Sequence, residues 1–166
     1  MLYMKKKLSL FLLGGALLTL VLINLPINLN KSSAQTTPTN ISGFAWSSNI
    51  GWIKMAGTNY GVNLSASGNF SNEAWSSNIG WIKFNPQGPS PDGSPVEAKL
   101  NADDSVTGWI RACSVFAEFC SGPLKPDNQR GGWDGWIKLH STGEPGEPTY
   151  GVNLVGNEFQ GYAWGS

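Results

Sequence analysis

The ten residues AWSSNIGWIK occur twice in this chain, at residues 45–54 and again at residues 74–83. An identical decamer indicates that the chain builds the same structural element twice. Inside the decamer, Ser-Ser-Asn is typical of a turn, and the flanking aromatic and β-branched residues are typical of strands. The decamer therefore predicts a β-hairpin, and Gly51 lets the second strand begin beside bulky neighbours.

Three short blocks with strand-like composition recur in a fixed order through the rest of the chain. The first block begins at Ile41, Phe70, Val106 and Phe159, the second at Gly51, Gly80 and Gly135, and the third at Tyr60, Val96 and Tyr150. Turn-forming residues separate the blocks, and nothing after residue 35 sustains a helical period. We therefore expect an all-β fold of about nine or ten strands.

The blocks group into tandem three-stranded antiparallel units. The units cover residues 41–69, 70–105 and 106–158, and a partial unit covers residues 159–166. Units of this kind stack or close as a solenoid, a prism or a small barrel, and the spacing does not choose among these. The last unit stops inside its first hairpin. The sequence is therefore either a fragment of a longer array, which we favour, or its final strand pairs with an exposed edge.

The second strand of each unit uses both of its faces. A period of two places Ile53, Ile82 and Ile137 on one face, which predicts the core. The other face carries tryptophans two residues from a Lys or Arg, whose alkyl stem can cover the indole. The recurring register favours a structural ladder, and the alternative is an aromatic platform that stacks sugars. The candidate platform residues are Trp52, Trp81, Trp109 and Trp136.

The N-terminal residues 1–34 have the composition of an export signal. Three lysines at 5–7 precede an apolar run at 8–23, and small residues precede Gln35. The run is shorter than the ~20 residues of a helix that spans a membrane. This favours a cleaved signal peptide, whose apolar run forms a hydrophobic signal helix, over an uncleaved membrane anchor. Residues 35–40 are then a linker, and residues 41–166 form a secreted or cell-surface domain that touches membrane only if the signal is retained.

Charge and motifs exclude several classes of function. Removing residues 1–34 leaves 11 − 4 = 7 basic residues against 11 acidic ones, a balance of −4 without a basic patch, which argues against nucleic-acid binding. The chain has no phosphate loop or dinucleotide motif, so we expect no cofactor. His140 is the only histidine, and no serine has a nucleophile-elbow pattern, so we expect neither a metal site nor an enzyme.

An insertion lengthens the first hairpin of the third unit. Trp46 and Trp52 are six positions apart, whereas Arg111 and the equivalent Trp136 are 25 apart. Export favours a disulfide between the two cysteines of this insertion, Cys113 and Cys120, whose spacing matches no zinc pattern. Long loops on β-scaffolds often bind ligands, although packing over the end of a sheet is the leading alternative. The candidate binding residues are Phe116, Phe119, Lys125, Asp127 and Arg130.

The repeated pattern G-[FY]-A-W-S-x-N-I-G-W-I followed by Y-G-V, and the stretch GWIRAC…C…GGWDGWIKL, resemble a family of Trp-rich tandem-repeat secreted proteins of small-genome uncultivated bacteria. The resemblance covers residues 41–166, and the cysteine-containing insertion is its most specific part. It implies export and repetition, and it transfers no catalytic residue. One departure is Arg111, which stands where other units have Trp.

These observations together predict a structural or adhesion module without catalytic activity. Its expected partners are other repeat domains, surface proteins or glycans. A carbohydrate-binding module that uses tryptophan platforms is the alternative function, and a hydrolase is a minor one.

Overall fold

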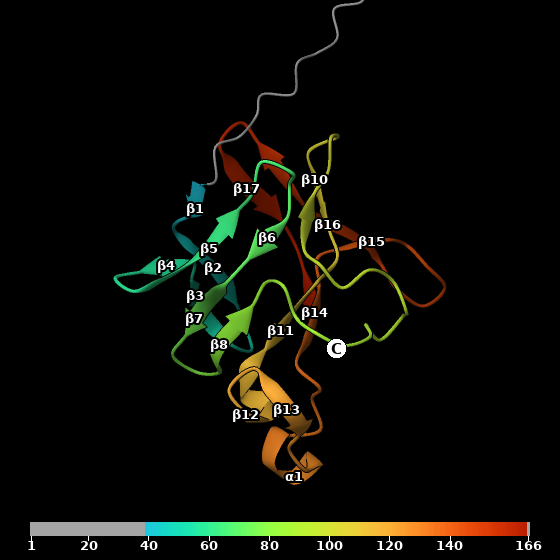
Figure 1. Cartoon of the computed structure of the whole chain (residues 1–166). Helices are drawn as coiled ribbons and strands as arrows, with labels where there is room; N and C mark the ends of the chain where they lie inside the picture. Colours follow the sequence, from blue (N-terminus) through green and yellow to red (C-terminus); the bar gives the residue numbers. More distant parts are fainter. Residues whose placement is uncertain (1–38, 166) are drawn as a thin grey trace, which may run out of the picture. The chain divides into compact units, whose positions relative to one another are not determined.

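The structure is a computed structural model that describes residues 39–165, and the side chains from Ile41 onward. It consists mostly of antiparallel β-strands (Figure 1), which confirms the all-β prediction. The predicted signal peptide and nearly all of the predicted linker lie outside the described residues. Within residues 39–165, no helix has the length and apolar character needed to cross a membrane.

The largest sheet has seven strands, which neighbour one another in chain order. They are β2 (Phe44–Ser47), β3 (Gly51–Lys54), β7 (Glu73–Ser76), β8 (Gly80–Lys83), β11 (Trp109–Ala112), β14 (Trp136–Lys138) and β18 (Trp164–Gly165). Both copies of the decamer form hairpins in the same register, with Trp46 opposite Trp52 and Trp75 opposite Trp81. The last strand, β18, pairs with β14 within the chain, with Trp164 opposite Lys138, as in the alternative to the favoured fragment interpretation.

Two smaller sheets contain the remaining strands of the repeated blocks. A four-stranded sheet contains β1 (Thr39–Ile41), β4 (Ala56–Gly57), β5 (Tyr60–Leu64) and β6 (Phe70–Ser71), and a five-stranded sheet contains β9 (Lys99–Leu100), β10 (Ser105–Thr107), β15 (His140–Thr142), β16 (Thr149–Val155) and β17 (Glu158–Gly161). A bridge between Asn69 and Lys99 joins the two sheets. The backbone N–H of Leu100 reinforces it by donating to the Gly68 carbonyl at 2.8 Å.

The structure has eighteen short strands among residues 39–165, rather than the nine or ten predicted. The difference arises partly because the first strand of each unit bends into a different sheet. At the bend between β10 and β11, Gly108 has a φ of +91°, and a Cβ there would lie 2.0 Å from the Glu97 carbonyl oxygen. Asn72, at the equivalent bend between β6 and β7, has a φ of +67°. Positive φ values at this position divide each predicted strand in two.

The core lies along the inner face of the large sheet. The predicted core residues Ile53, Ile82 and Ile137 are all buried, and Ile82 is fully inaccessible. They belong to one cluster with apolar side chains of the smaller sheets, including Val62 and Phe70. The predicted assignment of the two faces of the second strand is therefore correct for the core side.

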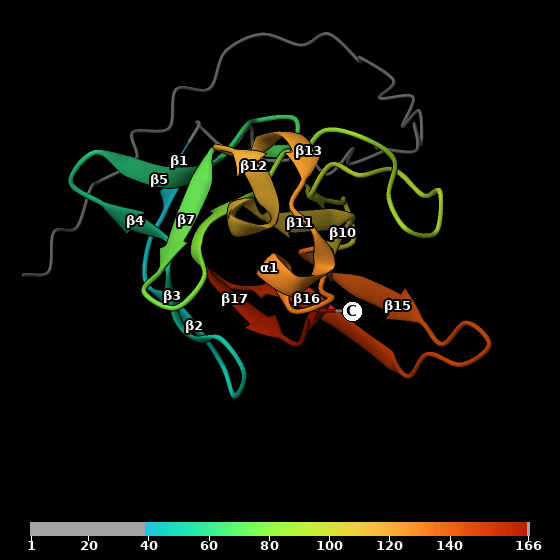
Figure 2. The ribbon, with the colours of Figure 1, turned by 90° about the horizontal axis from the view of Figure 1, so that it is seen from below.

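The insertion of the third unit forms a small substructure at the lower end of the view in Figure 1, and Figure 2 shows it from below, in front of the sheets. It contains the 3-10 turn η1 (Cys113–Val115), the hairpin β12 (Phe116–Glu118) and β13 (Ser121–Leu124), and the short helix α1 (Asp127–Arg130). Cys113 and Cys120 form a disulfide, as predicted. Arg111 and Trp136 remain opposite each other, so the insertion does not disturb the register of the hairpin that carries it.

Candidate binding surfaces

Aromatic side chains gather on the outer face of the large sheet, at the end formed by β2, β3, β7 and β8. This aromatic strip consists of Phe44, Trp46, Trp52, Trp75 and Trp81. Phe44, Trp46 and Trp52 are 62–63% exposed. Edge-to-face contacts link Phe44 to Trp52 at 6.1 Å and Trp75 to Trp81 at 4.8 Å between ring centroids. The strip is therefore a row of rings, linked in pairs by edge-to-face contacts, on the solvent-facing side of a hydrogen-bonded sheet.

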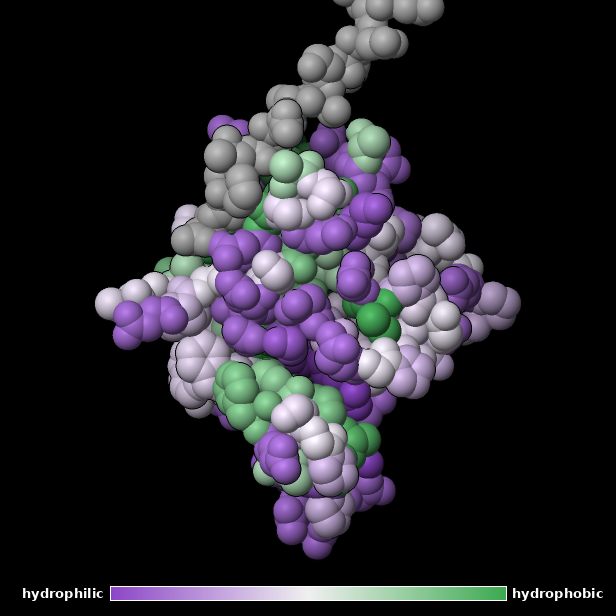
Figure 3. All heavy atoms as spheres, in the orientation of Figure 1, coloured by the Kyte–Doolittle hydropathy of each residue, from purple (hydrophilic) through white to green (hydrophobic). Residues whose placement is uncertain are grey.

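The disulfide-linked insertion extends the aromatic strip. Phe119 is 62% exposed and contacts the Trp81 ring at 6.1 Å, while Tyr60 approaches the same indole from β4–β5 at 5.0 Å. Figure 3 shows a hydrophobic area in the region where Figure 1 places β8, β12 and β13, bordered by hydrophilic residues. The insertion thus adds apolar surface beside the strip.

The predicted platform is wrong for two of its four tryptophans. Trp109 and Trp136 are only 5% and 3% exposed, so they offer no open face to a ligand. Their rings contact each other at 5.9 Å, and the Arg111 guanidinium lies 4.2 Å from the Trp136 ring centre. The Trp109 indole N–H donates to the Ser94 hydroxyl at 2.9 Å. Loop and cation therefore cover this half of the sheet.

Trp52 and Trp81 remain available, the former exposed and the latter half-buried. The prediction missed Trp46 and Trp75, which lie directly opposite them in the hairpins. The signal was present in the decamer: two residues that flank a short turn at equal distance become cross-strand neighbours on one face.

The polar residues of the candidate binding loop are used inside the insertion. Lys125 donates to the Ser114 carbonyl at 2.8 Å, and Arg130 forms an ion pair with Asp127 and donates to the Trp133 carbonyl at 2.8 Å. Such contacts hold the loop together.

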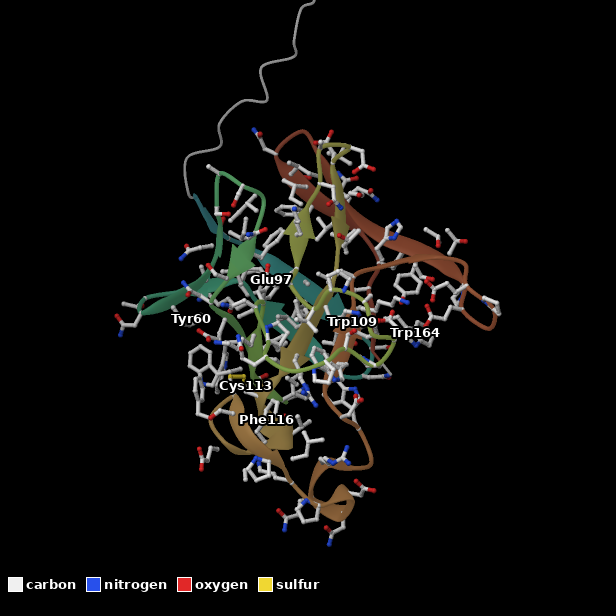
Figure 4. The ribbon with its side chains drawn as sticks, turned by 45° about the vertical axis from the view of Figure 1, so that its right-hand side comes forward. Tyr60, Glu97, Trp109, Cys113, Phe116 and Trp164 are labelled. Carbon is white, nitrogen blue, oxygen red and sulfur yellow. A yellow bond between two sulfur atoms is a disulfide. The ribbon has the colours of Figure 1, made fainter. Side chains whose placement is uncertain are left out.

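The two phenylalanines of the loop have different environments. Phe116 lies beneath the Arg111 guanidinium, whose carbon is 4.7 Å from the ring centre, and is half-buried. Figure 4 shows Phe116 beside Cys113 at the base of the insertion. Phe119 is the exposed one. Phe116 therefore packs the loop against the end of the sheet, whereas Phe119 stays exposed to solvent.

A polar cleft of about 550 Å³ lies between the loop before β9 and the β14–β15 strands. Lys138, buried at its edge, contacts carboxylates from both neighbouring loops: Asp92 at 3.0 Å, Glu147 at 3.0 Å and Glu144 at 3.5 Å. Burial alone would lower the pKa of Lys138, but hydrogen bonds to Glu147 and Asp92 raise it above its ordinary value. Lys138 therefore fastens two long loops to the sheet.

The two carboxylates that lie 3.0 Å from Lys138, Asp92 in the cleft and Glu147 beside it, have lowered pKa values. Burial alone would raise the pKa of Asp92, but hydrogen bonds from Ser94, Lys138 and Ser90 hold it far below its ordinary value. The hydrogen bond from Lys138 likewise lowers the pKa of Glu147. A general acid for glycoside hydrolysis needs a raised pKa, so these carboxylates have the opposite property. Among residues 39–165, no group of three or more His, Cys, Asp and Glu side chains is placed to hold a metal ion.

Comparison with known proteins identifies no relative from which a role could be transferred. No protein-family model, no curated protein and no solved structure matches the chain. Its function is therefore inferred from its own residues, above all from the aromatic strip.

Proposed function

We propose that this protein is a non-catalytic β-repeat module, secreted or displayed at the cell surface, that attaches to other surface proteins through the aromatic strip. The observation that carries the proposal is the solvent exposure of Phe44, Trp46 and Trp52 as one cluster. Clustered exposed apolar surface marks interaction sites on soluble proteins, and aromatic residues dominate the binding energy of interfaces. A hydrogen-bonded sheet holds these rings at little entropic cost on binding.

The strand pairings support the tandem-unit part of the proposal. In the first unit, β5 pairs with β1, β4 and β6. In the third unit, β16 pairs with the strands at the equivalent places in the sequence, β10, β15 and β17. The two outer strands of the large sheet, β2 and β18, do not pair with each other, which favours an open, solenoid-like stack over a closed barrel.

Location outside the cytoplasm is supported by two independent features. The Cys113–Cys120 disulfide is stable in oxidising compartments. The composition of residues 1–34 is that of an export signal. The predicted location can be tested by adding protease to the outside of intact bacterial cells, and to their periplasm, when they express a full-length chain with a C-terminal tag. We expect the chain to be cleaved in one of these compartments. Full protection of the chain in both compartments would contradict the predicted location.

Carbohydrate binding is the second candidate, because exposed, flat indoles beside a lysine stack well on sugar rings. Trp46 and Trp52 lie opposite each other in β2–β3, and Lys54 is exposed on the same face. In this reading the same strip binds glycans rather than proteins.

One pair of variants tests both candidates. We expect the Trp46→Ala/Trp52→Ala double variant to lose adsorption of the full-length chain to intact bacterial cells by at least tenfold. Tyr162→Ala is the matched control, because Tyr162 is 80% exposed at the position of the last unit that corresponds to Phe44. Loss of adsorption after protease treatment of the cells supports protein attachment, whereas a strip-dependent signal on a glycan array supports carbohydrate binding. Equal adsorption of all three chains would refute both.

A further inference from the structure

Strands β2 and β7 have nearly the same sequence but different surroundings. Both belong to an AWSSNIGWIK decamer, and each pairs with the second strand of its own hairpin. The other edge of β7 pairs antiparallel with β3, with Ser76 opposite Ile53 and Trp75 opposite Lys54. The other edge of β2 has no neighbouring strand among residues 39–165. The seam between β3 and β7 therefore shows what the β2 edge is equipped to bind.

Side chains at the tip of the second hairpin strengthen the seam between β3 and β7. The Ser76 hydroxyl donates to the Ile50 carbonyl at 3.1 Å, and the Asn78 side-chain amide donates to the same oxygen at 3.2 Å. Ser76 is fully buried there. Two donors thus recognise one carbonyl, three residues before the isoleucine that faces the core.

The β2 edge carries the same groups in a prepared turn. The Ser47 hydroxyl accepts from the backbone N–H of Asn49 at 3.2 Å, as the Ser76 hydroxyl does from that of Asn78 at 3.3 Å. Within residues 39–165, however, neither the Ser47 nor the Asn49 side chain donates to a carbonyl of another strand. Trp46 is 63% exposed, whereas Trp75, which has a strand beside it, is 37% exposed. The β2 edge therefore has the same turn, side-chain donors and tryptophan ring as the β7 edge at the seam, but no strand pairs with it among residues 39–165.

We propose that the free edge of β2 accepts an extended strand of the Gly-Trp-Ile-Lys pattern from a partner protein, as a second contact beside the aromatic strip of the proposed adhesion module. The incoming strand runs antiparallel to β2, with its Ile opposite Ser47 and its Lys opposite Trp46. The carbonyl three residues before that Ile accepts from Ser47 and Asn49. Backbone pairing supplies the affinity of such strand addition, and the alternating side chains supply the specificity.

A folded second copy does not offer this strand from the described part of the chain. The three strands with the required pattern, β3, β8 and β14, each have a neighbour on both sides in residues 39–165. The occupant is therefore a partner with an unpaired segment of this pattern. Pairing of two β2 edges with each other is the competing arrangement, which the experiment separates.

The experiment measures binding of a fluorescein-labelled peptide, residues 49–57 of this chain (NIGWIKMAG), to the full-length protein by fluorescence anisotropy. We expect saturable binding that a scrambled peptide of equal composition does not show. Removing one recognition hydrogen bond by Asn49→Ala or Ser47→Ala should weaken binding roughly three- to tenfold. Ser48→Ala is the matched control, because Ser48 is exposed in the same turn and, within residues 39–165, its hydroxyl makes only a 3.5 Å contact with the Asn49 side chain. Unchanged circular dichroism establishes that each variant is folded.

Three outcomes would overturn the proposal. The first is that the peptide shows no saturable binding, and the second is that the scrambled peptide binds equally well. The third is that the protein forms a concentration-dependent dimer in sedimentation, that Asn49→Ala abolishes this dimer, and that the peptide does not bind. The cell-adsorption assay is read separately. Peptide binding without cell adsorption leaves the edge proposal standing and removes the adhesion function, and the reverse result removes only the edge proposal.

Discussion

Replacing Lys138 with Met tests whether a buried cation holds the two long loops to the sheet. Met keeps the length and apolar bulk of the lysine stem but removes the ammonium group. That group lies 3.0 Å from Asp92 and 3.0 Å from Glu147, and the Lys138 side chain is only 9% exposed. In the variant, Asp92, Glu144 and Glu147 remain close together without their shared cation, so repulsion adds to the lost hydrogen bonds.

The magnitude follows from the geometry. A hydrogen bond to a charged group contributes about 1.5–3 kcal/mol, but the Asp92 and Glu147 side chains are 28% and 41% exposed, so water and salt screen the interaction. We therefore expect Lys138→Met to lower the free energy of unfolding by about 1–3 kcal/mol at neutral pH. The matched control is Lys54→Met at the equivalent position, where the lysine is exposed, and its effect should stay below about 0.5 kcal/mol.

The effect of Lys138→Met should depend on pH in a defined direction. The folded-state pKa values of Asp92 and Glu147 are lowered, so their contribution is present above the unfolded pKa and is lost as the pH falls through the folded pKa. The pKa of Lys138 is raised, so its contribution is lost only at alkaline pH, above its unfolded value. The difference between the variant and the parent should therefore be full near pH 7 and shrink as the pH is lowered from about 5 toward 2.

Urea unfolding followed by tryptophan fluorescence, at pH 7 and pH 3, measures the Lys138→Met difference directly. Hydrogen exchange of the loops around Asp92 and Glu147 reports whether they detach. The reasoning is refuted if Lys138→Met and Lys54→Met have equal effects at pH 7, or if the difference between them is the same at both pH values.

Three further predictions concern the scaffold. Gly108→Ala should lower the free energy of unfolding, measured with urea, by at least about 2 kcal/mol, because φ is +91° and the Glu97 carbonyl oxygen occupies the place of the Cβ. Gly43→Ala, at the equivalent bend but with open space around the Cβ, should lower it by about 1 kcal/mol. Equal losses for the two variants would contradict the clash at Gly108. Ile82→Ala should cost about 2–5 kcal/mol in the same assay because the side chain is fully buried, and a cost below about 1 kcal/mol would show that the site is not core. Replacing Cys113 and Cys120 together by Ser should cost about 2–3 kcal/mol, and thiol titration of the unreduced, unfolded parent should find no free thiol; two titratable thiols would disprove the bond.

The hairpins and the core could be predicted because their signals are local. The decamer contains both strands and the turn of one hairpin, and alternation alone places Ile53 and Ile82 on the buried face. The disulfide could also be predicted, because the spacing of the two cysteines matches no zinc pattern and the N-terminal composition favours export.

The bends and the covering of the platform could not be predicted from local pattern. The bend at Asn72 depends on a positive φ that asparagine tolerates but does not require. Trp109 and Trp136 have the same spacing to a cation as Trp52, but the Arg111 and Lys138 side chains and the loop of Ser94 lie against them. Those positions depend on residues distant in the chain, which a single strand pattern does not encode.

The chain-order arrangement of the seven-stranded sheet has a consequence for how the protein acquires its fold. Each strand from β2 to β14 pairs next with the strand that follows it in that sheet, so no pairing waits for a segment from the far end of the chain. The pairings among β2, β3, β7 and β8 close the shortest connections of this sheet and should form first, whereas β8–β11, β11–β14 and β14–β18 close longer loops and should form later. Nascent chains truncated after β8 should therefore already contain a protected β-core, and the disulfide should form after that core rather than guide it.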